Sequence, residues 1–222
     1  SRADQAIAVI RQALQANPRD ISLHDKLCCL LNYPDHTSPA EIFAAHRAFG
    51  QLVGAPPPVH RITDFSLDRR LRIGYLSGDL REHSISYFLE PLLEHHDRAR
   101  FDVFCYHVGA PDDTTTPRLR SHIPNWRHLF PISDLDLANA IAADRIDILI
   151  ELAGHAQGNR LSAVALGPAP IIVSYIGYPN TTGVPSVRYR FIDAITDPPS
   201  ADAFATETLV RLPGCFLCYR PY

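Results

Sequence analysis

Apolar residues recur at helical spacing at the start of the chain. Between residues 6 and 14 they occupy positions 6, 7, 10, 13 and 14, and Asn17-Pro18 ends this pattern. A second apolar run covers residues 23–31. Ser38-Pro39-Ala40-Glu41 then provides an N-cap, a proline at the first helical position and a capping-box acid for a third helix through Phe49. The pattern predicts three helices.

The order helix, Asn-Pro turn, helix resembles the junction between two tetratricopeptide repeats (TPR). We therefore assign residues 1–54 to a TPR-like helical region that ends in a bridging helix. Pro56-Pro57-Pro58 and the polar residues after it predict a stiff linker over residues 55–70.

After Arg70, short β-rich apolar runs alternate with helical patterns. Alternation of this kind predicts an α/β fold: a parallel, Rossmann-like sheet with helices on both faces. The apolar runs are continuous, which fits strands that are buried on both sides. We assign residues 71–222 to this domain. The predicted strands are 71–77, 101–108, 146–152, 171–176 and 191–195, the predicted helices are 86–96 and 133–143, and a last apolar stretch covers 207–212 and 215–219.

The composition of the chain argues against nucleic-acid and membrane partners. The 222 residues are 46% hydrophobic, enough for a buried core. Lys and Arg number 21 against 24 Asp and Glu, a net charge of −3, so we expect no nucleic-acid partner. No run approaches the roughly 20 apolar residues that span a bilayer. The start of the chain has no signal-peptide pattern. We expect no membrane partner and a cytoplasmic protein.

The cysteines do not predict a disulfide framework or a metal site. There are five, an odd number, and they lie within apolar runs. Cys215 and Cys218 have the spacing of half a zinc site, but no second pair completes the four ligands that a structural zinc requires. Methionine is absent, which suggests that the chain has lost its initiator or is part of a longer protein.

Polar loops follow three of the predicted strands. In parallel sheets, ligands bind at the carboxyl ends of the strands, so these loops are the candidate site. The first loop places Asp79 and His83 next to the start of a helix, where an anion is favoured. A carboxylate and an imidazole there suit a general base and a donor to a phosphate or sugar hydroxyl. The alternative is that Asp79 caps a turn and His83 is a surface residue.

The other two loops are also rich in hydrogen-bonding groups. Residues 154–160 include His155, whose alternative role is to satisfy a backbone carbonyl, and residues 177–183 combine two glycines with Asn and Thr side chains, which is also ordinary turn chemistry. We expect Asp79, His83, His155 and Tyr178 to open on one crevice. The first strand is followed by neither Gly-x-Gly-x-x-Gly nor a P-loop, so dinucleotide chemistry and P-loop hydrolysis are disfavoured.

Several motifs, in order, resemble the amino-terminal catalytic half of the O-GlcNAc transferase/SPINDLY family of protein O-glycosyltransferases. The likeness is closer to the SPINDLY-like bacterial branch. Leu31-Asn32-Tyr33 and Ala44-Ala45-His46-Arg47 also resemble the family's bridge between repeats and catalytic region. The catalytic motifs are residues 71–79 (LRIGYLSGD), 83–88 (HSISYF), 168–171 (PAPI), 175–183 (YIGYPNTTG), 197–199 (DPP) and 207–213 (ETLVRLP).

The resemblance implies the amino-terminal lobe of an inverting, metal-independent GT-B glycosyltransferase. It needs no cofactor, since the nucleotide sugar is a co-substrate. It implies that the base is an Asp, a His or a donor phosphate oxygen. Asp79 is the candidate base or proton relay, and His83 is a hydrogen-bonding partner of the sugar or phosphate. Two further residues, His155 and Asn159, are expected to line the site, and no residue is expected to bind a metal. The implied donor-binding residues are Ile176, Gly177, Tyr178, Pro179, Asn180 and Thr181.

The chain also departs from the family. Gly167 stands where the family usually has an Arg before Pro-Ala-Pro. The carboxyl-terminal lobe with the family's catalytic-site Lys does not appear, so we expect this chain alone to be inactive. The implied reaction moves GlcNAc from UDP-GlcNAc, or fucose from GDP-fucose, to Ser or Thr of acceptor proteins. An oligomer is compatible with the sequence. The alternative function is a TPR-type interaction module with a non-catalytic Rossmann-like domain.

Overall fold

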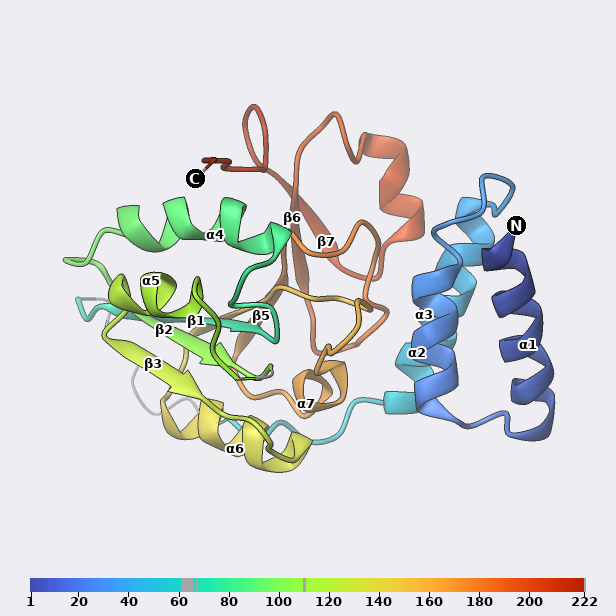
Figure 1. The fold of residues 1–222 in the computed structure, drawn as a ribbon, viewed down its shortest axis with the longest axis horizontal. Helices are drawn as coiled ribbons and strands as arrows, with labels where there is room; N and C mark the ends of the chain where they lie inside the picture. Colours follow the sequence, from blue (N-terminus) through green and yellow to red (C-terminus); the bar gives the residue numbers. More distant parts are fainter. Residues whose placement is uncertain (61–65, 67, 110, 222) are drawn as a thin grey trace.

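The computed structural model describes residues 1–60, 66, 68–109 and 111–221, so the predicted linker over 55–70 lies partly outside the described residues. The amino-terminal part consists of the three expected helices, α1 (Arg2–Ala16), α2 (Ile21–Leu30) and α3 (Pro39–Val53). Ser1, Asp20 and Ser38 cap them. A small core of Ile7, Leu27 and Leu31 joins them, and they form a layer beside the sheet domain (Figure 1).

The rest of the chain forms one parallel sheet in the order β3-β2-β1-β4-β5-β6-β7. This confirms the predicted fold class. Because the chain moves outward from β1 to β3 and then returns to β4, the order reverses between β1 and β4, where open α/β sheets bind ligands. The strands are β1 (Leu71–Ser77), β2 (Phe101–His107), β3 (Asn125–His128), β4 (Ile148–Glu151), β5 (Ile171–Ser174), β6 (Tyr189–Ile192) and β7 (Thr208–Arg211).

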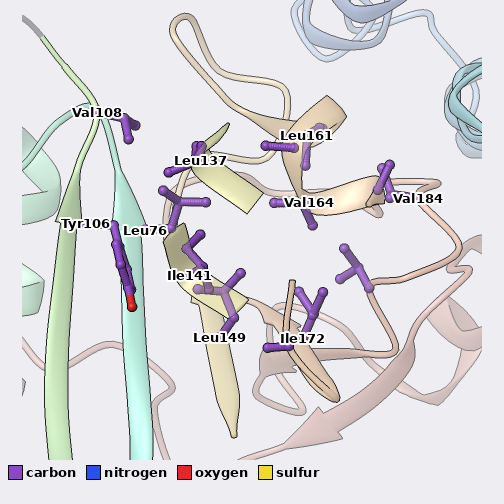
Figure 2. Close-up of a cluster of buried hydrophobic side chains, with 14 of the residues drawn as sticks. Leu76, Tyr106, Val108, Leu137, Ile141, Leu149, Leu161, Val164, Ile172 and Val184 are labelled. Carbon is purple, nitrogen blue, oxygen red and sulfur yellow. The ribbon is translucent and has the colours of Figure 1, made fainter. Parts of the chain in front are cut away.

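Helices cover both faces of the sheet. On one face, α4 (Ser84–His95) and α5 (Thr116–Ser121) pack over one apolar cluster, and on the other, α6 (Asp134–Ala143) and α7 (Leu161–Ala165) pack over a second. Figure 2 shows the second cluster, in which Leu137 and Ile141 of α6 face Leu76 and Leu149 of the strands. Side chains alternate between the faces along β1, because Tyr75 belongs to the first cluster and Leu76 to the second.

The predicted boundaries differ from the structure in a few places. The last predicted strand, 191–195, begins earlier and ends at Ile192, where the Asp193 side chain accepts backbone N–H bonds and turns the chain. Strand β3 and helices α5 and α7 were not predicted, because each is too short to show a periodic pattern. A 3-10 helix, η1 (Pro199–Phe204), precedes β7. Among the described residues, no helix has the length and apolar character needed to cross a membrane.

Candidate active site at the switch point

The loop from β1 to α4 holds Asp79, Arg81 and His83 together. The Asp79 carboxylate is largely buried, with 13% of its side chain exposed, and lies 3.1 Å from the Arg81 guanidinium. The His83 Nε2 atom is 3.9 Å from the other Asp79 oxygen, which is too long for a hydrogen bond. The structure therefore brings the two predicted catalytic residues together at the carboxyl end of β1.

The backbone of α4 determines which nitrogen of His83 carries the proton. His83 is the N-cap of α4, and its Nδ1 accepts a hydrogen bond from the Ile85 N–H at 3.3 Å. In a neutral imidazole the other nitrogen must then be the donor. The Nε2–H is thus free to donate to an oxygen that approaches the first turn of α4. The remaining amides of that turn and the helix dipole favour an anion at the same place.

A neighbouring loop braces this segment. The Asp113 carboxylate accepts the Glu82 N–H, and the Thr116 hydroxyl donates to the Leu80 carbonyl at 3.1 Å. Gly109, after β2, lies so close to Gly78 that a Cβ atom would come within 1.9 Å of the Gly78 oxygen. The backbone on either side of Asp79 is thus held by the segment that follows β2.

The loop after β4 turns toward the helical region. His155 is 2% exposed; its Nδ1 faces the Asp25 carboxylate of α2 at 2.7 Å and its Nε2 faces the Thr182 carbonyl at 2.8 Å. Asn159 also donates to Asp25. The expectation that the His155 side chain opens on the crevice with Asp79 is wrong, because both ring nitrogens are used inside the seam between helices and sheet.

The loop after β5 has a constrained backbone. Ile176 adopts φ +71°, which is rare for a β-branched residue and marks a strained position. A Cβ atom on Gly177 would lie 1.8 Å from the Leu152 carbonyl oxygen, so only glycine fits. Pro179 follows, and its carbonyl accepts from Arg190 at 2.6 Å. The predicted donor loop therefore has a single, well-defined shape.

The side chains of this loop point to other parts of the molecule. The Tyr178 hydroxyl contacts the Asn32 amide and His46, so the polar end of this side chain does not open on the crevice as expected. Asn180 donates to Asn32. Thr181 donates to Glu207 at 2.5 Å, at the entry to β7. The hydrogen-bonding groups of Tyr178, Asn180 and Thr181 are thus turned to partners outside the crevice.

A cleft of about 330 Å³ lies beside this loop. Phe88 of α4, Ile176, Phe216 and Leu217 form an apolar part of its wall, and Gly177, Tyr178 and Pro179 also line it. Polar groups come from Thr196, Asp197 and Arg190, whose guanidinium is paired with Asp197 at 2.9 Å. The predicted residue set did not include these wall residues except in the loop itself. Two motifs nevertheless contained wall residues: residues 83–88 include Phe88, and Asp197-Pro198-Pro199 includes Asp197.

Helix α4 connects the cleft with Asp79 and His83. His83 caps its first turn, Phe88 lies farther along it, and the Ile85 side chain reaches within 3.0 Å of the place where a Gly177 Cβ would be. The loops after β1 and β5 thus flank the same end of α4. This arrangement offers an acid–base pair, a helix terminus suited to phosphate and an apolar cleft along one edge of the sheet.

Two groups of side chains among the described residues have metal-ligand chemistry. Neither includes Asp79 or His83; they are Cys28, His46 and His155, and His107, Asp112 and His128. In the first, all four imidazole nitrogens face hydrogen-bond partners. In the second, Asp112 is already paired with Arg120.

Comparison with known proteins identifies a set of relatives. The model of glycosyl transferase family 41 matches residues 1–219. An Arabidopsis thaliana protein named "Probable UDP-N-acetylglucosamine--peptide N-acetylglucosaminyltransferase SPINDLY" is 40% identical over 197 residues, which are 86% of this chain and 22% of the relative. A Caenorhabditis elegans UDP-N-acetylglucosamine--peptide N-acetylglucosaminyltransferase is 38% identical over 174 residues, 75% of this chain and 15% of the relative.

The fold has a close counterpart among solved structures. A mutant O-GlcNAc transferase of Thermobaculum terrenum superposes with a TM-score of 0.91 at 36% identity, over 97% of this chain and 42% of that one. The chain spans about a fifth of the length of the plant relatives that it matches.

Proposed function

Since the chain belongs to glycosyl transferase family 41, we propose that it is the amino-terminal lobe, with its adjoining TPR-like helices, of a protein O-glycosyltransferase. The observation that carries this proposal is the placement of Asp79 and His83 together at the switch point of the sheet, beside the first turn of α4. The names of the relatives, which describe transfer of N-acetylglucosamine to peptides, support it.

The reaction is a single displacement with inversion. A Ser or Thr hydroxyl oxygen of the acceptor protein attacks the anomeric carbon, and the bond from that carbon to the diphosphate oxygen breaks. The hydroxyl proton passes to Asp79, directly or through a relay. The nucleoside diphosphate leaves, and the His83 Nε2–H donates to an oxygen on which charge develops. No metal is needed, because the helix terminus and the imidazole face the leaving phosphate.

The cleft and the loop 176–181 receive the sugar end of the donor in this proposal. Ile176 and Gly177 present backbone to the ligand, while Tyr178, Pro179, Asn180 and Thr181 hold the loop in shape through contacts elsewhere. Most contacts with the nucleotide come from a second lobe of a longer protein. The helical region recruits acceptor proteins, as a TPR-type surface does.

The donor is UDP-GlcNAc or GDP-fucose. The names of the relatives favour UDP-GlcNAc. The sequence resemblance to the SPINDLY branch implies GDP-fucose. Both donors belong in the test, because neither the cleft nor the loop 176–181 distinguishes one nucleotide base from the other.

Transfer of radiolabelled sugar by the full-length protein tests the proposal. Each donor is incubated with an acceptor-protein extract, with and without EDTA, and label on protein is counted. We expect transfer from one donor, unchanged by EDTA, and only background from a double variant with Asp79→Asn and His83→Ala. If neither donor labels protein, the helices and lobe form a non-catalytic interaction module instead. Loss of activity with EDTA would overturn the metal-independent mechanism.

A further inference from the structure

A polar seam with a buried centre joins the helical region to the sheet domain. On the helical side it consists of Asp25, Asn32 and His46, and on the sheet side of His155, Asn159, Tyr178 and Asn180. The sheet-side residues lie on the loops after β4 and β5. The helices therefore contact the very loop that lines the cleft.

Tyr178 is the centre of this seam. Its hydroxyl oxygen lies 2.7 Å from His46 Nε2, 2.8 Å from the Asn32 amide nitrogen and 3.0 Å from the Cys28 carbonyl oxygen. His46 Nδ1 faces the Ile42 carbonyl at 2.7 Å and must donate to it, so a neutral His46 accepts the tyrosine proton at Nε2. Asn32 then donates to the tyrosine oxygen.

Burial keeps the His46 imidazole neutral. The His46 side chain is wholly buried, and burial together with the neighbouring His155 lowers the pKa of His46 to about 3. His46 is therefore a fixed acceptor for the Tyr178 hydroxyl at neutral pH. Hydrogen bonds of this type are costly to break, because a buried group that loses its protein partner has no water molecule to replace it.

The side chain of Tyr178 also packs against the backbone of a neighbouring loop. A Cβ atom on Gly154 would lie 2.3 Å from Tyr178 Cβ, so the ring packs directly on the loop after β4. Two residues earlier, Ile176 is held at φ +71°, a conformation that persists only where the surroundings enforce it. The anchor at Tyr178 lies two residues after the strained Ile176, which lines the cleft.

We propose that Tyr178 is a positioning residue: Asn32 and His46 of the helical region hold its hydroxyl, and thereby set the shape of the donor loop 176–181. This inference rests on the proposed function, because it assigns the helices a part in donor binding besides recruiting acceptors. The simpler alternative is that the seam only stabilises the fold.

A matched control separates these two roles. Tyr75 also has a buried hydroxyl 2.7 Å from a histidine Nε2, that of His96. His96 follows the carboxyl end of α4, whereas the cleft lies toward the other end of that helix. Tyr75→Phe therefore also removes a tyrosine–histidine hydrogen bond, but one that lies outside the donor loop.

The experiment compares Tyr178→Phe and Tyr75→Phe in the full-length protein. We expect both variants to melt at similarly lowered temperatures, and only Tyr178→Phe to raise the KM for the donor, by about three- to tenfold, the ratio that one lost hydrogen bond corresponds to. Asn32→Ala should raise this KM as well, and the double variant should raise it by less than the product of the two effects. Equal KM values in the two tyrosine variants would overturn the proposal.

Amide hydrogen exchange provides a readout that does not depend on catalysis. We expect residues 176–183 to exchange faster in Tyr178→Phe than in Tyr75→Phe. If the unaltered protein transfers sugar from neither donor, the proposed function fails, and this exchange comparison alone decides on the positioning role. Unchanged exchange across residues 176–183 would then overturn it.

Discussion

The two residues proposed to act in catalysis have different environments. Asp79 is mostly buried beside Arg81, whereas the His83 side chain is 38% exposed and is oriented by the Ile85 N–H. Asp79 can therefore accept a proton at a fixed place, and His83 can donate from Nε2 only. These roles make separate predictions for the two side chains.

Asp79→Asn should lower the turnover number of the full-length enzyme by at least about a hundredfold, because general-base assistance is commonly worth 10²–10⁴. Asn keeps the shape and removes the proton acceptor. Asp102→Asn is the control: Asp102 pairs with Arg70 at 2.9 Å but lies near the amino end of β2. Single-turnover transfer measures both variants. A loss below about tenfold for Asp79→Asn would indicate that a donor phosphate oxygen is the base.

Replacing His83 should separate capping from catalysis. His83→Ala removes the N-cap and the imidazole, so we expect a loss of about 1 kcal/mol in unfolding free energy as well as slower transfer. His83→Asn supplies an efficient N-cap without an imidazole, so it should restore stability and still reduce turnover by about tenfold or more. Urea unfolding and initial transfer rates are the measurements. Full activity in His83→Asn would mean that His83 serves α4 alone.

Among the elements, α3 makes the closest contact between the helical region and the sheet domain. Gly50 of α3 faces Gly183, and a Cβ atom on Gly50 would lie 1.8 Å from the Gly183 carbonyl oxygen. Gly183 in turn adopts φ +72° and approaches the His46 carbonyl. The helix and the loop after β5 fit together only because both positions lack side chains.

Gly50→Ala should destabilise the protein by about 1–3 kcal/mol, because backbone must move to admit the methyl group. Helix propensity alone predicts the opposite sign, a gain of roughly 1 kcal/mol for Ala in a helix interior. Gly54→Ala, at φ +70° with open space around it, should cost about 1 kcal/mol through backbone strain only. Chemical denaturation shows whether each variant has a lower or a higher unfolding free energy than the unaltered protein. A more stable Gly50→Ala protein would show that this contact is loose.

At the scale of the whole molecule, the helical region and the sheet domain share a buried, titratable seam. Burial and the adjacent His155 lower the pKa of His46 to about 3, well below that of an exposed histidine. The unfolded chain therefore binds a proton at His46 more readily than the folded protein does. The contribution of neutral His46 to the unfolding free energy is therefore complete at neutral pH. It is lost as the pH falls below the pKa that His46 has in the unfolded chain.

Acidification from pH 7 to pH 5 should therefore lower the unfolding free energy by about 2 kcal/mol through His46. Burial raises the pKa of Glu151, which acts in the opposite direction. The comparison with His46→Gln isolates the histidine, since Glu151 is present in both proteins. Thermal and urea unfolding at several pH values should give a flatter profile for the variant. Parallel profiles would contradict a neutral, buried His46.

The hydrophobic pattern by itself determined the three amino-terminal helices, the parallel sheet and the edge at which Asp79 and His83 meet. These features follow from local periodicity and from the rule that parallel strands place their following loops on one edge. The short, polar β3 has no such signal and gains its place only by pairing with β2. Contacts with β2, and not the local sequence, therefore determine where β3 forms.

Tertiary structure alone decided where the side chains of His155 and Tyr178 point. Both follow buried strands as a ligand residue would, so their sequence positions fit either a crevice or an interface. Their partners, Asp25, Asn32 and His46, are more than a hundred residues away along the chain. A buried polar group turns to whichever donor or acceptor satisfies it, and in this protein packing of the helices against the sheet supplied those partners.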